Sequence, residues 1–364
     1  MADKAKTSII GKSDLGCLRN NNEDAFVAQN IWNDNTFLIV VIDGVGGYEG
    51  GEVAADIARR SIPDYLSASS NGERVELLKQ AVTSANNAIF EARESNPEVG
   101  QMSCVLTSAI VDIDQRKISM AHVGDTRMYG FHNGILTKLS HDHSIIGYRE
   151  EIGDLSEEEA MRHPQRNVIS RDVGSQKHKV NDEEFIEAQE FPLMPNTTLL
   201  LCSDGLTDLV TTSQIIDILN NDDSLERKAD FLINAALRAG GKDNVTVVLF
   251  DYQCEEDDDE YHVDTSIEEG KEIMTAMKLN NEPVGAKSVP YKKVWAIAVS
   301  SFVAGIIVCG LTICLYINSL LHKGACYPKT QQDTTVDIAD TAIFNTVMPQ
   351  LKIEYFQVQN DSLR

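Results

Sequence analysis

Four aspartates at the ends of strongly apolar segments are the residues of this chain best suited to bind a cation. They are Asp43, Asp125, Asp204 and Asp243. The first three each follow a strand-like segment, whereas the fourth precedes the segment 245–250, so all four can meet at one edge only if that last strand runs antiparallel to the others. Carboxylates held that close repel one another unless cations lie among them, and oxygen ligands favour Mg²⁺ or Mn²⁺. The pattern therefore predicts a metal centre.

Each aspartate taken alone is more simply explained as a turn residue, because Asp-Gly and Asp-Asn are common turn dipeptides. Convergence of the whole set, with a further candidate in Asn22-Glu23-Asp24, favours the metal centre. Arg19 is the one cation of residues 16–24, and its planar guanidinium can bind phosphate through two hydrogen bonds. A structural ion pair from Arg19 to Glu23 or Asp24 is an equal alternative.

The composition indicates a large folded domain with appendages. The 364 residues are 42% hydrophobic, and their formal net charge of −24 argues against nucleic acid as a partner, because nucleic acid binding needs a basic surface. The seven cysteines include no Cys-x-x-Cys pair, so Cys17, Cys104 and Cys202 are expected to be buried free thiols in a reducing compartment. The polar first six residues do not resemble a signal peptide.

Residues 294–317 are 24 consecutive residues without a charge, which predicts a transmembrane helix. At about 1.5 Å per residue they would span roughly 36 Å, enough to cross a bilayer with some tilt. A buried core helix is the alternative. Residues 255–293 are expected to form an acidic linker or a docking site for a basic partner, since nine of residues 255–269 are acidic. Residues 318–364 are predicted to be a polar tail.

Strand-like and helical patterns alternate over residues 8–252. Apolar residues recur at helical spacing within 53–58, 75–89 and 223–240. The polar stretch 144–167, which contains a helix N-cap at Ser156, is expected to be a small inserted lobe.

Seven short motifs occur in order along these residues. They are SDLG at 13–16 with Arg19 and NED at 22–24, VIDGVGG at 41–47, GDTR at 124–127, LSHDHS at 139–144, HPQRNVI at 163–169, CSDGL at 202–206 and GKDNVT at 241–246. In this order they resemble the metal-dependent Ser/Thr protein phosphatases of type 2C, particularly the bacterial members. The resemblance implies an α/β fold for residues 1–254, a four-layer αββα sandwich of two antiparallel sheets flanked by helices. Residues 144–167 resemble the flap that lies beside the active site in that family.

The same resemblance implies a metal-ligand set. Asp43 would bridge two Mn²⁺ or Mg²⁺ ions, with Asp204 and Asp243 completing the protein ligands of the first ion. The backbone carbonyl of Gly44 would bind the second ion. Two cations bridged by one carboxylate lower the pKa of a shared water, which can then attack phosphorus in line.

Further residues take roles by the same resemblance. Glu23 and Asp24 would hold waters of the second ion, and Asp125 would bind a third, weaker ion that shares Asp204. Arg19 matches the arginine that binds the substrate phosphate.

The chain departs from some members of the family at Val45, where certain eukaryotic enzymes carry a histidine. An imidazole acid is therefore absent at that position, and the leaving group must take its proton from metal-bound water, another group or solvent. Four histidines are expected to be structural, because oxygen ligands alone explain metal binding here. They are His122, His141, His143 and His163.

The predicted function is hydrolysis of phosphoserine and phosphothreonine in proteins, so the expected partners are phosphorylated proteins, the substrates of Ser/Thr kinases. The alternative is a pseudophosphatase that binds phosphoproteins without hydrolysing them. That class usually lacks a ligand, whereas Asp24, Asp43, Asp204 and Asp243 are all present. A dinuclear phosphohydrolase of small molecules is also compatible with such a site.

The charges that flank residues 294–317 give a weak signal for membrane orientation. Three lysines precede the segment and two follow it: Lys287, Lys292, Lys293, Lys323 and Lys329. Positive charge favours the cytoplasmic side. We therefore expect a single-pass protein of the cytoplasmic membrane, with the catalytic domain in the cytoplasm and the 318–364 tail outside.

Overall fold

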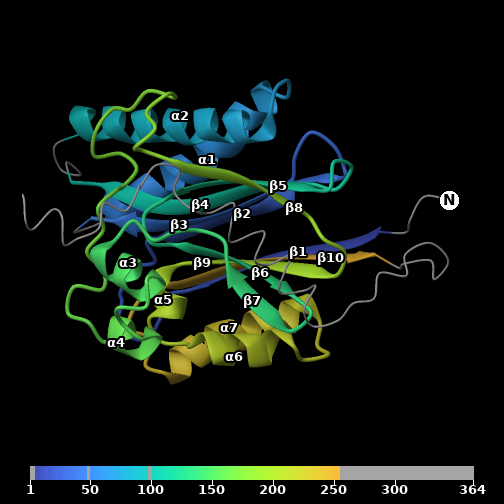
Figure 1. Cartoon of the computed structure of the whole chain (residues 1–364). Helices are drawn as coiled ribbons and strands as arrows, with labels where there is room; N and C mark the ends of the chain where they lie inside the picture. The colour runs from blue at the N-terminus through green and yellow to red at the C-terminus, as the bar shows by residue number, and fades with distance from the viewer. Residues whose placement is uncertain (1–4, 47–49, 97–100, 255–364) are drawn as a thin grey trace, which may run out of the picture. The chain divides into compact units, whose positions relative to one another are not determined.

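The computed structural model describes residues 5–46, 50–96 and 101–254 (Figure 1). The predicted linker, span and tail, residues 255–293, 294–317 and 318–364, lie outside these residues. Within the described ranges, no helix is long and apolar enough to cross a bilayer. The described chain forms an α/β fold with two five-stranded sheets in which every pairing is antiparallel.

The first sheet contains the N-terminal strand and the last described strand side by side. In spatial order its strands are β1 (Ala5–Asp14), β10 (Val245–Cys254), β9 (Thr197–Cys202), β6 (Arg127–His132) and β7 (Ile135–Lys138). In the β9–β10 pair, Cys202 lies opposite Val247, so the end of β9 and the start of β10 share one edge. This is the strand reversal that the sequence predicts for Asp243.

The second sheet carries the other two strand-end aspartates. Its strands, again in spatial order, are β2 (Asp24–Asn30), β3 (Thr36–Val45), β4 (Ser103–Asp112), β5 (Lys117–Val123) and β8 (Glu187–Pro192). Because β3 and β5 both pair antiparallel with β4, they run in the same direction. The ends of β3 and β5 therefore lie at the same edge.

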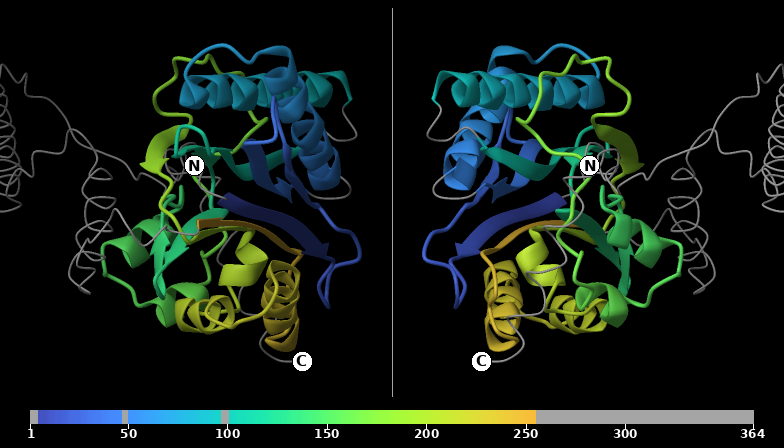
Figure 2. Two further views of the ribbon diagram at one scale, coloured as in Figure 1. Left: turned by 90° about the vertical axis from the view of Figure 1, so that its right-hand side faces the viewer. Right: turned by 90° about the vertical axis from the view of Figure 1, so that its left-hand side faces the viewer.

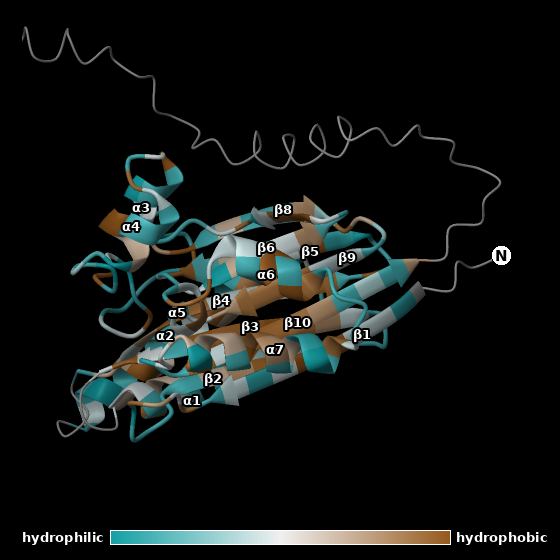
Figure 3. Cartoon of the chain, turned by 90° about the horizontal axis from the view of Figure 1, so that it is seen from below, coloured by the Kyte–Doolittle hydropathy of each residue, from teal (hydrophilic) through white to brown (hydrophobic). Residues whose placement is uncertain are grey.

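The two sheets pack face to face, and β3 shows why its sequence is apolar at every position. Alternate side chains of a strand point to opposite faces. Phe37, Ile39 and Val41 join the core between the sheets, whereas Leu38 and Val40 face the helices on the other side. The ring of Phe37 lies 5.0 Å from that of Phe250 on β10. The hydropathy colouring shows β3 and β10 as mostly apolar ribbons (Figure 3).

Helices cover the outer face of each sheet (Figures 1 and 2). On the second sheet lie α1 (Gly50–Ala68) and α2 (Arg74–Ser95), and on the first lie α5 (Asp204–Thr207), α6 (Thr212–Leu219) and α7 (Leu225–Arg238). The helices predicted within 53–58, 75–89 and 223–240 correspond to α1, α2 and α7. The predicted α/β fold, two antiparallel sheets flanked by helices, is confirmed.

The inserted lobe at 144–167 contains two short helices, α3 (Ile145–Glu151) and α4 (Glu157–Met161). Ser156 caps α4, with its hydroxyl accepting from the Glu159 N–H while the Glu159 side chain accepts from the Ser156 N–H. A β-bridge between Ser144 and Ile169 closes the base of the lobe. We refer to residues 144–169 as the flap.

The thiols only partly follow the sequence prediction. Cys104 and Cys202 are free and buried, as expected. The prediction for Cys17 was wrong, because this residue is exposed. It lies in the loop after β1, where its backbone N–H donates to the Gly241 carbonyl at 2.7 Å and its side chain is not part of a sheet face.

Candidate metal centre

The strand ends bring the predicted carboxylates to adjoining edges of the two sheets. Asp43, near the end of β3, lies directly opposite Asp24, the first residue of β2. Asp125 follows β5 by two residues, Asp204 begins α5 just after β9, and Asp243 precedes β10 by two residues. The structure thus collects residues that are as much as 219 positions apart in the sequence.

The carboxylates are buried, and they lie close enough to raise one another's pKa. Burial raises the pKa of Asp43 well above its usual range, and the charges of Asp24, Asp204 and Asp125 raise it further. Burial, followed by the charge of Asp204, raises the pKa of Asp125 to about 8. Burial and then the charge of Asp243 also raise the pKa of Asp204. Each group is therefore costly to ionise unless a cation offsets its charge.

A short hydrogen-bond chain joins the two sheets at Asp24. The Ser203 hydroxyl donates to Asp24 Oδ2 at 2.8 Å, and the Thr246 N–H donates to Ser203 Oγ at 3.0 Å. Burial raises the pKa of Asp24 to about 7, although hydrogen bonds from Thr246 and Ser203 oppose the shift. Asp24 is therefore held against β9 and β10 as well as against Asp43.

The glycine of the Asp-Gly step near the end of β3 is required by close packing against α1. The Gly44 N–H donates to the Glu23 carbonyl at 3.1 Å. A Cβ atom at Gly44 would lie 2.3 Å from the Gly51 carbonyl oxygen and 2.6 Å from that of Glu23. A Cβ atom at Gly51 would lie 2.8 Å from Glu23 Oε2. The two glycines thus let α1 and the Glu23 side chain approach the end of β3.

Arg19 lies next to this carboxylate group, but its ion pair differs from the predicted one. Its Nη2 is 2.7 Å from Asp243 Oδ2, so the alternative pairing with Glu23 or Asp24 was wrong. The side chain remains 48% exposed. The hydrogen bond to Asp243 is the main reason that the pKa of Arg19 is raised. The guanidinium is thus placed at the open side of the aspartates.

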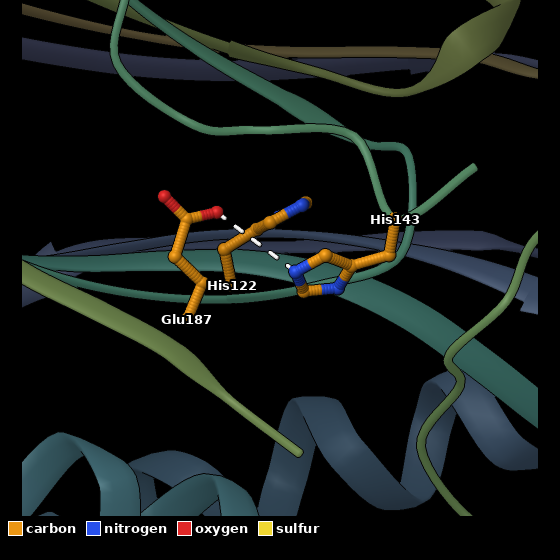
Figure 4. Close-up of side chains that lie close together, drawn as sticks. All are labelled: His122, His143 and Glu187. Carbon is orange, nitrogen blue, oxygen red and sulfur yellow. Dashed lines mark ion pairs between the residues drawn. The ribbon is translucent and has the colours of Figure 1, made fainter. Parts of the chain in front are cut away.

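The donor set suits a hard cation. The predicted ligands are carboxylate oxygens and one backbone carbonyl, which are the ligands that Mg²⁺ and Mn²⁺ prefer. Within the described residues, three potential ligand atoms within 4.8 Å of one another occur not among the aspartates but at His122, His143 and Glu187 (Figure 4).

Comparison with known proteins identifies the family. Residues 19–245 match the family described as "Protein phosphatase 2C". The chain belongs to this family. A relative in Listeria welshimeri named "Serine/threonine phosphatase stp" is 36% identical over 243 residues, which are 65% of this chain and 93% of the relative.

Solved structures agree with this assignment to the phosphatase 2C family. A Mycobacterium tuberculosis serine/threonine phosphatase, PstP/Ppp, superposes with a TM-score of 0.60 at 30% identity, over 68% of this chain and 99% of that one. A PstP catalytic domain described as "in complex with 2 Manganese ions" has a TM-score of 0.59 at 28% identity, over 69% of this chain and 100% of that one. The predicted enzyme class, a protein serine/threonine phosphatase, is confirmed.

Two charged residues beside the centre of this phosphatase, Asp208 and Arg166, were not predicted from the sequence. Asp208 lies four residues after Asp204, about one helical turn, and burial followed by the Asp204 charge raises its pKa to about 7. Arg166 of the flap is 4% exposed and its Nε lies 3.0 Å from Asp208 Oδ1. The i, i+4 spacing from Asp204 could have pointed to Asp208, whereas no local signal marks Arg166 as its partner.

A cavity of about 770 Å³ lies between the flap and the segment that contains Asp208. His163 and Arg166 line it from the flap, and Asp208 and Lys242 line it from the other side. Lys242 directly precedes Asp243. The predicted flap therefore borders a hollow that reaches the edge of the carboxylate group.

The sequence predicts Asn244 only as part of a turn dipeptide. In the structure, its side chain forms hydrogen bonds that connect the loop around Arg19 to the start of β10. Its Oδ1 accepts from the Glu23 N–H at 2.8 Å. Its Nδ2 donates to the carbonyls of Leu15 and Asn21 at 2.9 and 3.0 Å. Asn244 therefore positions the segment that carries the proposed phosphate-binding arginine.

Proposed function

We propose that this phosphatase hydrolyses phosphoserine and phosphothreonine in proteins at a dinuclear Mn²⁺ or Mg²⁺ centre with Asp43 as the shared ligand. The observation that carries the proposal is the convergence of the aspartates at the adjoining sheet edges, where Asp43 lies directly opposite Asp24. Burial, followed by the charges of four neighbouring aspartates, raises the pKa of Asp43 well above its usual range. The PstP catalytic domain described with two manganese ions has the same fold.

The ions, when bound, would lower the pKa of a shared water for in-line attack on phosphorus and offset charge on the phosphoryl oxygens. Asp204 and Asp243 lie on the side of the first sheet and would complete the first site. The Gly44 carbonyl would bind the second ion, and Glu23 and Asp24 would accept hydrogen bonds from its waters. Asp125, next to Asp204, would serve a third and weaker ion.

Arg19 is proposed to bind the phosphate of the substrate. Its guanidinium is half exposed and is anchored through one nitrogen to Asp243. The other N–H groups of the planar fork are therefore available for two parallel hydrogen bonds to phosphate oxygens. Anchoring reduces the side-chain entropy that phosphate binding would otherwise cost.

The decisive assay uses the full chain and a phosphothreonine peptide, with Mn²⁺ and with EDTA. Mn²⁺-dependent release of phosphate that EDTA abolishes is expected. Asp43→Asn should be inactive, whereas Asp34→Asn, an exposed aspartate at the opposite end of β3, should match the wild type. Peptide binding without turnover would replace the enzyme with a pseudophosphatase.

The finer assignment of place and partners is also part of the proposal. Residues 294–317 would anchor the enzyme in the cytoplasmic membrane through one span, with domain 1–254 in the cytoplasm and tail 318–364 outside. The support is the uncharged 24-residue segment and the lysines before it. Phosphoproteins made by Ser/Thr kinases are the proposed substrates.

A further inference from the structure

His122, His143 and Glu187 converge from three separate segments (Figure 4). His122 is fully buried on β5, where it pairs with Thr107 of β4 on one side and with Glu187 of β8 on the other. His143 stands just before the flap. The Nε2 atom of His143 lies 3.9 Å from Glu187 Oε2, the contact that the dashed line in Figure 4 marks.

Both histidines bind the backbone of the same residue, Gly124. Its N–H donates to His143 Nδ1 at 3.0 Å, and its carbonyl lies 3.0 Å from His122 Nε2. The carbonyl also accepts from the backbone N–H of His143 at 2.6 Å. Both polar groups of Gly124 are thus held, at a φ of +110° that favours glycine. The next residue is Asp125.

The residue on the other side of Asp125 is held by the same group. Thr107 Oγ1 lies 2.8 Å from His122 Nδ1 and 2.7 Å from Thr126 Oγ1, and it is 3.1 Å from the Thr126 carbonyl. All three of these side chains are buried. Asp125 therefore lies between Gly124, whose backbone the two histidines hold, and Thr126, whose side-chain hydroxyl contacts the same network through Thr107.

The hydrogen bonds assign the protons and argue against a metal ion among these histidines. Because a carbonyl can only accept, His122 Nε2 carries its proton, and Nδ1 is left to accept from Thr107. Because a backbone N–H can only donate, the lone pair of His143 Nδ1 is used by Gly124. A metal would have to displace these bonds from buried groups.

The network also reaches the base of the flap. The carbonyl of His143 accepts from the N–H of Ser170 at 2.7 Å and from its hydroxyl at 2.9 Å. Ser170 follows the bridge that closes the flap, and Ser144, the first flap residue, follows His143. Glu187 fixes the same turn by accepting from the His141 N–H at 3.0 Å and by pairing with its ring at 2.7 Å.

We propose that His122 and His143 are positioning residues for Asp125, which clamp Gly124 and thereby couple the flap base to the third ion site. The inference rests on the proposed role of Asp125 as a metal ligand. In this role neither histidine would contact the substrate or the ions. Partners that orient a ligand typically change metal affinity or activity by about 10–100-fold when they are replaced.

Two amide variants of His143 form a matched test. In His143→Asn, the side-chain oxygen can occupy the place of Nδ1 and accept from the Gly124 N–H. In His143→Gln, the amide lies one bond further out, near the place of Nε2, and leaves that N–H without its partner. The Mn²⁺ concentration for half-maximal activity of the full chain should rise by about tenfold in the Gln variant and by much less in the Asn variant.

A double mutant shows whether the effect passes through Asp125. Asp125→Asn alone should raise the Mn²⁺ requirement, and His143→Gln should add nothing in that background. His132→Ala, at a partly exposed histidine at the far end of β6, is the control and should match the wild type. Independent effects that multiply in the double mutant would overturn the proposal.

Hydrogen exchange separates failure of the clamp from failure of the site assignment. His143→Gln should speed exchange at the amides of residues 124–126. Unchanged exchange in a folded variant would overturn the clamp, whatever Asp125 does. Faster exchange, together with a wild-type Mn²⁺ requirement in Asp125→Asn, would instead overturn the role of Asp125. Loss of a bound ion in His143→Gln that Asp125→Asn retains would show that the histidines form a metal site of their own, contrary to the proposal.

Discussion

Replacing Asp125 by Asn should stabilise the metal-free phosphatase and weaken the Mn²⁺-loaded one. Asp125 is only 3% exposed, and burial followed by the Asp204 charge raises its pKa from 3.8 to about 8. In the unfolded chain this group ionises near pH 3.9. Between about pH 4 and pH 8 the folded protein thus holds more protons than the unfolded one, so its free energy of unfolding falls as the pH rises.

The size of the effect follows from the shift. About four pKa units separate the folded and unfolded groups, and each unit is worth roughly 1.4 kcal/mol, so the upper limit is about 6 kcal/mol at pH 8. Part of this repulsion is shared with Asp204, which also titrates upward. In EDTA at pH 8, the free energy of unfolding of Asp125→Asn should therefore exceed that of the wild type by roughly 2–4 kcal/mol. At pH 5 this difference should be smaller by about 2 kcal/mol.

Urea unfolding, monitored by circular dichroism, measures the free energy of unfolding of the full-length wild type and of Asp125→Asn at both pH values. Adding Mn²⁺ at pH 8 should reverse the order of stability, since a ligand that binds the folded state stabilises it in proportion to its affinity. The exposed substitution Asp34→Asn controls for a general charge effect. Two results together would refute the reasoning. Asp125→Asn would be less stable than the wild type in EDTA at pH 8, and the stability of the wild type would not fall from pH 5 to pH 8.

Three further predictions concern catalysis and topology. Asp43→Asn should keep the circular dichroism spectrum and lose turnover, and activity above roughly a tenth of wild type would contradict a bridging role, since metal ions contribute several kcal/mol to the transition state. Arg19→Ala should raise KM for a phosphopeptide without changing the Mn²⁺ requirement, and a loss confined to kcat would argue against phosphate binding. A reporter active only outside the cytoplasm should be on when fused after Arg364 and off when fused at residue 260. The reverse pattern would overturn the proposed topology.

The edge at which the aspartates meet could be predicted from sequence because each strand end is a local pattern. An apolar run such as 36–42 identifies a strand buried on both faces, and the Asp-Gly that follows identifies the end of the strand that carries the carboxylate, although β3 itself continues to Val45. Asp243 precedes its strand, so it can join the other aspartates only if β10 runs antiparallel to the strand beside it. The pairing of β10 with β9 bears this out.

The partners of the buried charges could not be predicted in this way. Arg19 forms an ion pair with Asp243, which is 224 positions away in the sequence. The local sequence 16–24 contains only Glu23 and Asp24 as possible acidic partners. Arg166 likewise meets Asp208 through the fold of the flap. Such contacts depend on how separate helices, strands and loops pack against one another. The apolar alternation of a strand or the apolar spacing of a helix carries no information about this packing.

The buried charges of this enzyme fall into two groups with opposite behaviour. Burial alone would raise the pKa of Asp142, but Arg127 and Lys138 outweigh burial and hold that pKa well below its usual range. Arg127 binds both Asp142 and Glu150 at 2.7 Å, so the base of the flap is held by groups that stay ionised without any metal. Asp125, two residues before Arg127, has its pKa raised to about 8 by burial and by Asp204.

Removing the metal should therefore change the ionisation of the aspartates and leave that of the Arg127–Asp142 pair unchanged. The Arg127–Asp142 pair keeps its charges, so the flap base and the Gly124 clamp remain in place while the aspartates repel one another or take up protons. The proposed ligands are thus held by a framework whose own charges do not depend on a bound ion. This arrangement explains how a set of mutually repelling carboxylates can be held together before any ion binds.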